Sequence, residues 1–385
     1  MRRPGFFAKQ ILISKFILFQ ICLTILLFSC SGPSSEPLTY VEEEIVFFSN
    51  PNELHGTLIL PEKKGQHPAV VLLHGSGRGS GDSPYYIDNS FNMVQSGFAV
   101  LRYDSPGKGK SIGNTFGETL EYRTQEAISA VKYLQSRDDI KSDAVGLWGI
   151  SQGGWICQMA AADSNEIAFI IPVSGPGVTP AEQEVFRVEM ESKAAGFTEV
   201  EISKAVLMRR LMVDVFLSEP KYENLNKEVS VSLGKGPWDD FHALIYNKTE
   251  DFDLELKQIY DILTSIQDEN WSRFLHLDEA LPMIENLPKE QWKGIKTSFE
   301  AMMINDPADY LSKVRCPVLA IFGEEDKVIP VERSVELYKL YLKNAGNKDV
   351  TIKVFPNADH RIFVGEKQAS GYYDIISEWL LDLNF

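Results

Sequence analysis

Basic residues are scarce in this chain. It holds 38 lysines and arginines against 54 aspartates and glutamates, so its formal net charge at pH 7 is −16. Four of the basic residues lie within residues 1–29, which contain no acidic residue, so the rest of the chain is nearer −20 (−16 − 4). Nucleic acids and anionic membrane surfaces attract positively charged proteins. We therefore expect no nucleic acid and no anionic membrane surface as a partner.

Cysteine is also rare, at four residues in 385. Cys22 and Cys30 lie in the N-terminal segment, which leaves Cys157 and Cys316 for the folded part of the chain. Two isolated thiols form no disulfide framework, and no pair has the C-x-x-C spacing of a metal site. We expect both to be small buried hydrophobic residues and predict no metal and no other cofactor.

The apolar run near the N-terminus, Phe16–Phe28, is short for a membrane-spanning helix, which needs roughly 20 residues. Basic residues precede it and the small residue Ser29 follows it, as in an export signal. The ending Leu27-Phe28-Ser29-Cys30 resembles the lipobox of bacterial lipoproteins. The resemblance implies that residues 1–29 are a lipoprotein-type signal peptide and that Cys30 is lipidated. We then expect residues 30–42 to be a tether and the protein to be exported and lipid-anchored to a membrane of the cell envelope. An uncleaved membrane anchor is the alternative.

A phosphate-binding loop is absent. The glycine-rich stretch His74–Asp82 follows an apolar run, but no Lys-Ser or Lys-Thr pair follows its glycines. Gly109-Lys110-Ser111 imitates the end of such a loop, yet the glycine required before it falls on Asp104. So many glycines after a buried strand indicate instead a backbone that approaches another group closely.

Apolar runs of strand length alternate with helical patterns along most of the chain. Repeated β-α units with short connections predict a mainly parallel sheet flanked by helices. The expected strands are Glu44–Ser49, Leu54–Leu60, Ala69–Leu73, Phe98–Tyr103, Val145–Gly149, Ile167–Val173, Pro317–Phe322 and Val350–Phe355. The first two are expected to form an antiparallel hairpin. The expected core helices are Leu120–Gln135, Gly154–Ala161, Val331–Lys343 and Ser370–Leu383.

Between residues 178 and 305 the strand pattern vanishes and charged helical periods replace it. We expect helices at Glu182–Ala195, Glu199–Leu217 and Phe252–Asp268. This block is therefore an insertion into one α/β domain made of residues 43–177 and 306–385. Two sets of its residues are either buried packing or part of a binding pocket: the helically spaced Met208, Leu211, Met212 and Val215, and the aromatic Trp238, Phe241, Trp271 and Trp292.

The stretch Gly149-x-Ser151-x-Gly153 lies between an expected strand and an expected helix. A serine on so short a hinge takes a strained backbone conformation, and a Cβ at either flanking glycine would clash with the neighbouring elements. The strain exposes the serine hydroxyl at the helix N-terminus. The backbone N–H of Gln152 then faces the place where an oxyanion would form.

Five motifs follow one another along the chain: His74-Gly75-Ser76-Gly77, Asp104-x-x-Gly107-x-Gly109-x-Ser111, Gly149-Ile150-Ser151-Gln152-Gly153-Gly154, Gly323-Glu324-Glu325-Asp326 and Asn357-Ala358-Asp359-His360. In this order they resemble the motifs of the α/β-hydrolase superfamily, over about Glu44 to the C-terminus. Within the superfamily the chain looks closest to the bacterial esterase, dienelactone-hydrolase and prolyl-oligopeptidase-like group. The resemblance implies an α/β-hydrolase fold with the insertion as a large helical cap.

The resemblance also implies a catalytic triad of Ser151, Asp326 and His360. A serine hydroxyl needs a base to take its proton, and an acid group must hold the imidazole in one tautomer. The implied oxyanion donors are the backbone N–H groups of Ser76 and Gln152, and Gly77 is an alternative to Ser76. For Asp326 the alternative is an exposed acidic turn, with Asp359 as a rival acid. A structural role is expected for the other histidines, which are His55, His67, His74, His242 and His276.

These features predict a serine hydrolase that cleaves a small-molecule carboxylic ester through an acyl-enzyme intermediate. A peptidase or an acyltransferase would use the same triad. A binding protein without turnover is the remaining alternative, since a fold does not determine chemistry. Because the cap would leave the sheet edge that carries Ser151, we expect it to cover the nucleophile and shape the substrate pocket.

Overall fold

The computed structural model of the chain describes residues 38–114, 119–217, 220–246 and 251–385. The predicted signal peptide, Cys30 and most of the predicted tether lie outside these ranges. Among the helices within them, none has both the length and the hydropathy of a membrane-spanning segment.

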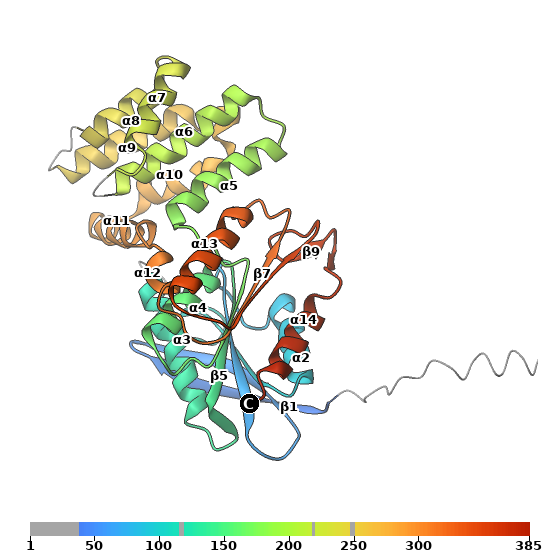
Figure 1. The fold of residues 1–385 in the computed structure, drawn as a ribbon. Helices are drawn as coiled ribbons and strands as arrows, with labels where there is room; N and C mark the ends of the chain where they lie inside the picture. The colour runs from blue at the N-terminus through green and yellow to red at the C-terminus, as the bar shows by residue number, and fades with distance from the viewer. Residues whose placement is uncertain (1–37, 115–118, 218–219, 247–250) are drawn as a thin grey trace, which may run out of the picture. The chain divides into compact units, whose positions relative to one another are not determined.

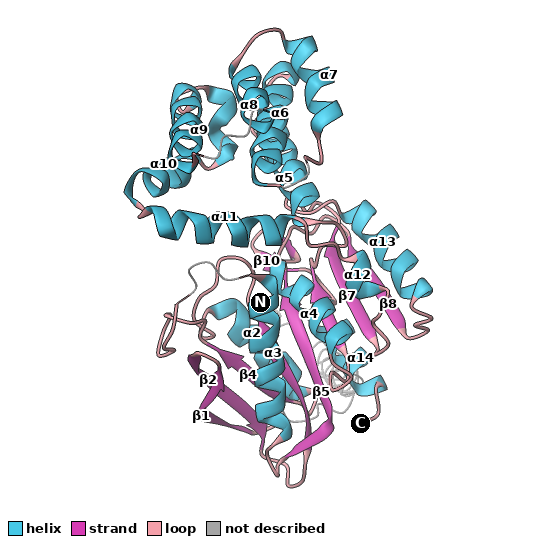
Figure 2. Ribbon diagram, turned by 90° about the vertical axis from the view of Figure 1, so that its left-hand side faces the viewer, coloured by secondary structure: helices cyan, strands magenta, loops and turns pink. Residues whose placement is uncertain are grey.

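An eight-stranded sheet runs through the described residues in the order β1-β2-β4-β3-β5-β6-β7-β8 (Figures 1 and 2). Strand β2 pairs with β1 and β4 in antiparallel fashion, and all other neighbours are parallel. The predicted opening hairpin and the mainly parallel sheet are therefore confirmed. The strands are β1 Tyr40–Ser49, β2 Asn52–Pro61, β3 His67–Leu73, β4 Ala99–Tyr103, β5 Ile140–Ile150, β6 Ile170–Val173, β7 Val318–Gly323 and β8 Val350–Phe355.

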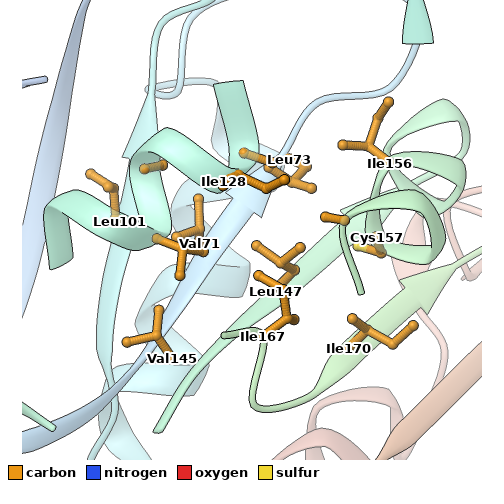
Figure 3. Packing of buried hydrophobic residues seen from close by; sticks show 14 of the residues in the cluster. Val71, Leu73, Leu101, Ile128, Val145, Leu147, Ile156, Cys157, Ile167 and Ile170 are labelled. Atoms are coloured by element: carbon orange, nitrogen blue, oxygen red, sulfur yellow. The ribbon is translucent and has the colours of Figure 1, made fainter. Parts of the chain in front are cut away.

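Helices cover both faces of this sheet. The core helices are α2 Pro84–Gln95, α3 Leu120–Gln135, α4 Gln152–Asp163, α12 Ala308–Leu311, α13 Val331–Asn344 and α14 Tyr372–Asp382. Side chains alternate between the faces along each strand. In β3, Val71 and Leu73 belong to the hydrophobic cluster that also holds residues of α3, α4 and α13, whereas Val70 and Leu72 belong to the cluster that holds residues of α2 and α14. Figure 3 shows part of the first of these two cores. Burial on both faces explains why β3 reads as a continuous apolar run.

Several elements differ from the predictions; strand β5, for example, begins at Ile140 and not at Val145. Strand β1 begins at Tyr40, so the last three residues of the predicted tether belong to the sheet. The first five residues of β1 are exposed, so no apolar alternation marks them, and main-chain pairing with β2 orders them. Strand β6 is shorter than predicted and starts at Ile170. Helix α2 was not predicted, although Pro84 follows the N-cap Ser83 in the favoured first helical position.

The block between β6 and α12 is helical, as predicted. Its first helix begins at Pro180 and its last ends at Met303, inside the expected range 178–305. The elements of this cap are α5 Pro180–Ala194, α6 Glu199–Phe216, α7 Glu223–Leu233, α8 Pro237–Tyr246, α9 Phe252–Ile266, η1 Asn270–Leu275, α10 Leu277–Asn286 and α11 Lys289–Met303. Apolar residues of these helices form two hydrophobic clusters of their own. The cap therefore holds its helices together by burial within the insertion.

The cap leaves the sheet beside the serine turn. Ser151 follows the last residue of β5, and its backbone N–H donates to the carbonyl of Val173 at the end of β6 (2.8 Å). The carboxyl ends of parallel strands meet at one edge of a sheet, where open α/β sheets bind ligands. The connection from β6 to α5 starts at that edge, and Figure 2 shows the cap helices at this end of the sheet.

Candidate active site

Ser151 occupies a strained turn between β5 and α4. Its backbone angles are φ 55° and ψ −120°, a left-handed conformation that costs energy for any residue with a side chain. A Cβ at Gly149 would lie 2.3 Å from the carbonyl oxygen of Gly153, and a Cβ at Gly153 would lie 2.8 Å from that of Leu73. Neither contact is tolerable, so the turn requires glycine at both positions. The strain predicted from the sequence is present.

His360 and Asp326 are paired. His360 Nδ1 lies 2.7 Å from Asp326 Oδ2, and the Asp326 side chain is fully buried. The other carboxylate oxygen, Oδ1, accepts hydrogen bonds from the backbone N–H groups of Val328 (2.8 Å) and Ile329 (3.2 Å). These contacts fix the carboxylate, which in turn fixes the orientation of the imidazole ring. The His360 side chain itself is 21% exposed and reaches a cavity.

The rival acidic residues point elsewhere. Asp359 Oδ1 accepts from the N–H groups of Arg361 and Phe363, at 2.8 and 2.9 Å, and so shapes the loop that carries His360. Glu324 Oε2 accepts from the N–H of Asn357 at 3.0 Å. Asp326 is therefore the carboxylate that contacts His360, and it does not lie in an exposed turn.

A cavity of about 670 Å³ lies between the sheet edge and the cap. Its core-domain lining is Ser76, Ser151, Gln152, Trp155, Val328 and His360. The structure thus brings together all the predicted site residues of the folded part, with Asp326 directly behind His360. Residues of six α-helices of the cap and of η1 form the opposite wall, so the cap covers Ser151 as expected.

The side of Ser151 predicted to hold an oxyanion is formed by Gln152 and the loop after β3. Gln152 is the first residue of α4, and the first N–H groups of a helix have no partner within it. A Cβ at Gly75 would lie 3.6 Å from Ser151 Cβ, so this loop packs directly against the serine. Ser76 follows and lines the cavity. The positive end of the α4 dipole and the loop after β3 therefore lie beside Ser151.

Arg123 of α3 connects these two segments and was not predicted. Its buried guanidinium donates to Gln152 Oε1 through Nη1, and to the carbonyl oxygens of His74 and Gly75 through Nη2, at 3.3 Å for Gly75. One side chain thereby ties the loop after β3 to the start of α4. No local sequence pattern marks an arginine within a helix as one that connects two distant segments.

Of the other histidines, His74 is buried in the core and His276 lines the cavity. His74 is buried, with Nε2 2.7 Å from the carbonyl oxygen of Tyr103. Burial lowers the pKa of His74 to about 4, so its ring is neutral at pH 7, consistent with a structural role. His276 at the start of α10 lines the cavity, which was not predicted.

The sequence left open whether two sets of cap residues are packing or pocket residues, and each set contains both kinds. Met212 and Val215 line the cavity, whereas Met208 and Leu211 are fully buried within the cap. Among the aromatic residues, the cavity-lining ones are Phe241 and Trp292, and the ones that pack in the cap instead are Trp238 and Trp271. Helical spacing identifies the apolar face of α6 but does not show which of its residues meet open space.

Charged side chains are embedded in the cap wall. Burial raises the pKa of Glu184, but Arg209 and Arg187 outweigh that effect and hold it below its usual value, so Glu184 is ionised. Burial lowers the pKa of Arg209, which stays charged at physiological pH. A second pair lines the cavity at Lys296 and Glu255, whose Nζ and Oε1 are 2.8 Å apart.

Within the described ranges, no group of three or more histidine, cysteine or acidic side chains is arranged to hold a metal ion. Cys157 is buried in the core shown in Figure 3, and Cys316 is half-buried. Burial raises the pKa of both thiols, to about 12 for Cys316. Both thiols are therefore protonated at pH 7. Cys157 is buried as expected, whereas Cys316 is not fully buried.

Two family models match the chain. Residues 52–189 match the model described as X-Pro dipeptidyl-peptidase (S15 family), and residues 274–383 match the prolyl oligopeptidase family. The first range contains Ser76, Ser151 and Gln152, and the second contains Asp326 and His360.

Individual proteins are similar over most of the chain. The 2-hydroxy-6-oxo-6-phenylhexa-2,4-dienoate hydrolase of Comamonas testosteroni is 23% identical over 308 residues, which is 80% of this chain and 86% of the relative. Among solved structures, the α/β hydrolase GrgF from Penicillium sp. sh18 is 16% identical with a TM-score of 0.51, covering 90% of this chain and 98% of the other. The Pyrococcus furiosus esterase Pf2001 is 16% identical with a TM-score of 0.50, covering 91% and 95%. The structural likenesses confirm the predicted fold class.

Proposed function

We propose that this chain, a member of the α/β-hydrolase superfamily, is a serine hydrolase that cleaves carboxylic esters through an acyl-enzyme intermediate. One observation carries the proposal. Ser151 stands on a strained turn at the floor of a cavity that His360 also lines, and the imidazole Nδ1 lies 2.7 Å from a buried carboxylate. A structural serine has no need of a strained turn, a helix N-terminus and a buried His-Asp pair together.

The proposed reaction assigns one role to each group. Ser151 Oγ attacks the ester carbonyl carbon while His360 Nε2 accepts its proton. Asp326 keeps the proton on Nδ1 and stabilises the imidazolium. The N–H groups of Gln152 and Ser76 donate to the oxyanion, and Arg123 holds the segments that carry both. His360 then protonates the leaving alcohol, and a water molecule activated by the same imidazole hydrolyses the acyl-enzyme.

The cavity supports an organic substrate with a substantial apolar part. Its volume of about 670 Å³ is in the range of pockets for small organic ligands. Apolar side chains from the core and the cap line it, including Trp155, Met302 and Phe241. Such a wall binds an acyl or alcohol group by burial of apolar surface.

A peptidase is the second candidate, because both matched family models carry peptidase descriptions. The test is a panel of ester, thioester and aminoacyl amide substrates, assayed on the wild type and on Ser151→Ala. The proposal expects ester hydrolysis above all other activities, lost in the variant. Preferential cleavage of amides would favour the peptidase. Acyl transfer to added alcohols that exceeds hydrolysis would identify an acyltransferase instead.

We also propose that the protein is exported and held at a membrane by lipid on Cys30. The basic residues before Phe16–Phe28 and the ending Leu27-Phe28-Ser29-Cys30 support this proposal. Mass spectrometry of the membrane fraction should find lipidated Cys30 as the N-terminus and no peptide from residues 1–29. An unmodified N-terminus, or release of the wild-type protein as a soluble export product, would contradict the anchor.

A further inference from the structure

Arg209 of α6 is a buried cation in the cap wall of the cavity. It lines the cavity, and only 7% of the residue is exposed. Its guanidinium has five N–H donors and stays charged at physiological pH. A buried charge is costly unless ion pairs and hydrogen bonds compensate it. Any N–H donor of Arg209 without an acceptor in the protein is therefore available to an acceptor on a ligand.

Those partners are few. Nη2 donates to the carbonyl oxygen of Leu275 at 3.1 Å, and Nε has no hydrogen-bond partner among the described residues. Nη1 lies 3.9 Å from Glu184 Oε2, which is beyond hydrogen-bond distance. The neighbouring Arg187 is well satisfied by comparison: it donates to both oxygens of Glu184, at 3.0 and 3.4 Å, and to Glu191 at 2.6 Å. Glu184 is thus engaged by Arg187, and Arg209 is left with unused donors.

The charged side chains that line the cavity balance one another. Among the described residues that line it, three carboxylates accompany three cations. These groups are Glu184, Glu255, Glu279, Arg187, Arg209 and Lys296. The cation Lys296 has its own partner in Glu255 at 2.8 Å. The cavity therefore has no general positive field, and its distinctive polar feature is the set of unmatched donors of Arg209.

We propose that the preferred substrates are esters whose acyl chain ends in a second carboxylate, which Arg209 binds. This proposal rests on the hydrolase function proposed above. A carboxylate is the planar acceptor that matches a guanidinium, and charge-assisted hydrogen bonds are about twice as strong as neutral ones. Apolar residues such as Met212 and Leu263 line the same cavity and would contact the methylene groups between the two ends.

Glu184 sets the strength of this preference. Its ionised carboxylate lies near Arg209 and would repel an anionic ligand that binds there. Replacement of Glu184 by glutamine should therefore increase the preference for carboxylate-ended substrates, whereas replacement of Arg209 should abolish it. General damage to the cap would not raise the preference in the Glu184 variant and abolish it in the Arg209 variant.

The test compares matched pairs of 4-nitrophenyl esters with equal chain length. One member of each pair is a monoester of a dicarboxylic acid, from succinate to sebacate, and the other ends in a methyl group. At the best length we expect kcat/KM to be at least ~10-fold higher for the carboxylate-ended ester, as for a hydrogen bond to a charged group. Arg209→Met should remove this ratio, and Arg209→Lys should retain part of it.

Arg210→Met is the matched control. Arg210 is the next residue of α6 and does not line the cavity, so this variant should keep the wild-type ratio. Activity on 4-nitrophenyl acetate and the thermal midpoint identify variants that have lost their fold. A wild type with no preference at any length would overturn the proposal without any variant. Equal loss of the ratio in Arg209→Met and Arg210→Met would also overturn it.

A binding measurement separates this proposal from the proposed function. Calorimetry on Ser151→Ala should show tighter binding of monomethyl suberate, which has one free carboxylate, than of methyl octanoate, which has none, and Arg209→Met in that background should remove the difference. If acetate hydrolysis is absent in the wild type but this binding difference is present, the hydrolase function fails and the Arg209 site stands. If hydrolysis of 4-nitrophenyl acetate is present and methyl octanoate binds as tightly as monomethyl suberate, the Arg209 site fails alone.

Discussion

Replacing Asp326 by asparagine isolates the role of the buried carboxylate. The asparagine Oδ1 can still accept the N–H groups of Val328 and Ile329, which lie 2.8 and 3.2 Å from Asp326 Oδ1. The loop should therefore keep its shape. The amide Nδ2, however, is a donor where Asp326 Oδ2 now lies 2.7 Å from His360 Nδ1. Nδ1 must then accept, which moves the ring proton to Nε2 and leaves no base for Ser151.

The expected loss follows from that change of tautomer. In other Ser-His-Asp enzymes the corresponding substitution costs about 10⁴-fold in kcat. That factor corresponds to about 5 kcal/mol of transition-state stabilisation. We expect Asp326→Asn to lose at least ~10²-fold in kcat on 4-nitrophenyl acetate, with the thermal midpoint little changed.

Asp359→Asn is the matched control. Its carboxylate accepts only backbone N–H groups of its own loop, at 2.8 and 2.9 Å, and no hydrogen bond joins it to His360 in the described structure. This variant should keep most of the activity. If Asp359→Asn lost as much activity as Asp326→Asn, or if Asp326→Asn stayed active, the reasoning would be refuted.

Three further predictions concern the triad, the cap and the pH dependence of stability. Ser151→Ala and His360→Ala should each remove nearly all turnover, and kinetics of the double variant should show no additional loss because the residues act as a unit. Met212→Ala should change the ranking of ester substrates, because Met212 lines the cavity. Trp238 packs within the cap, so Trp238→Ala should change mainly the thermal midpoint. Unchanged rankings in Met212→Ala would contradict this prediction. His74 has a folded pKa of about 4, so it is neutral in the fold while the unfolded chain binds a proton below about pH 6.5. Between pH 7 and pH 4 the free energy of unfolding, measured by urea titration, should fall by about 3 kcal/mol more in the wild type than in His74→Gln. An equal fall in both proteins would refute the lowered pKa of His74.

The parts of the site that were predictable depend on local constraints. Gly149 is required within the turn itself, because a Cβ there would lie 2.3 Å from the carbonyl oxygen of Gly153, so the strained turn is visible in the sequence. Strands buried on both faces are continuous apolar runs, which is why β3, β7 and the second half of β5 were found, whereas the polar first half of β5 was missed. Such features need no knowledge of distant parts of the chain.

Other parts depend on contacts that no local pattern encodes. Asp326 and Asp359 are both acidic residues in turns, and only the three-dimensional arrangement shows which one contacts His360. Arg123 acts on two segments that are 48 and 29 residues away. The helical period of α6 identifies its apolar face, but the packing of the other cap helices decides that Met212 lines the cavity and Met208 does not.

Active-site labelling tests the central claim most directly. An alkyl fluorophosphonate reacts with serines that are activated as nucleophiles, and mass spectrometry of the digested protein identifies the modified residue. We predict a stoichiometric adduct on Ser151 in the wild type, much slower labelling in His360→Ala, and no adduct in Ser151→Ala. An unmodified Ser151 in the folded wild type, or equally fast labelling of Ser151 in His360→Ala, would contradict the claim that Ser151 is a nucleophile activated by His360.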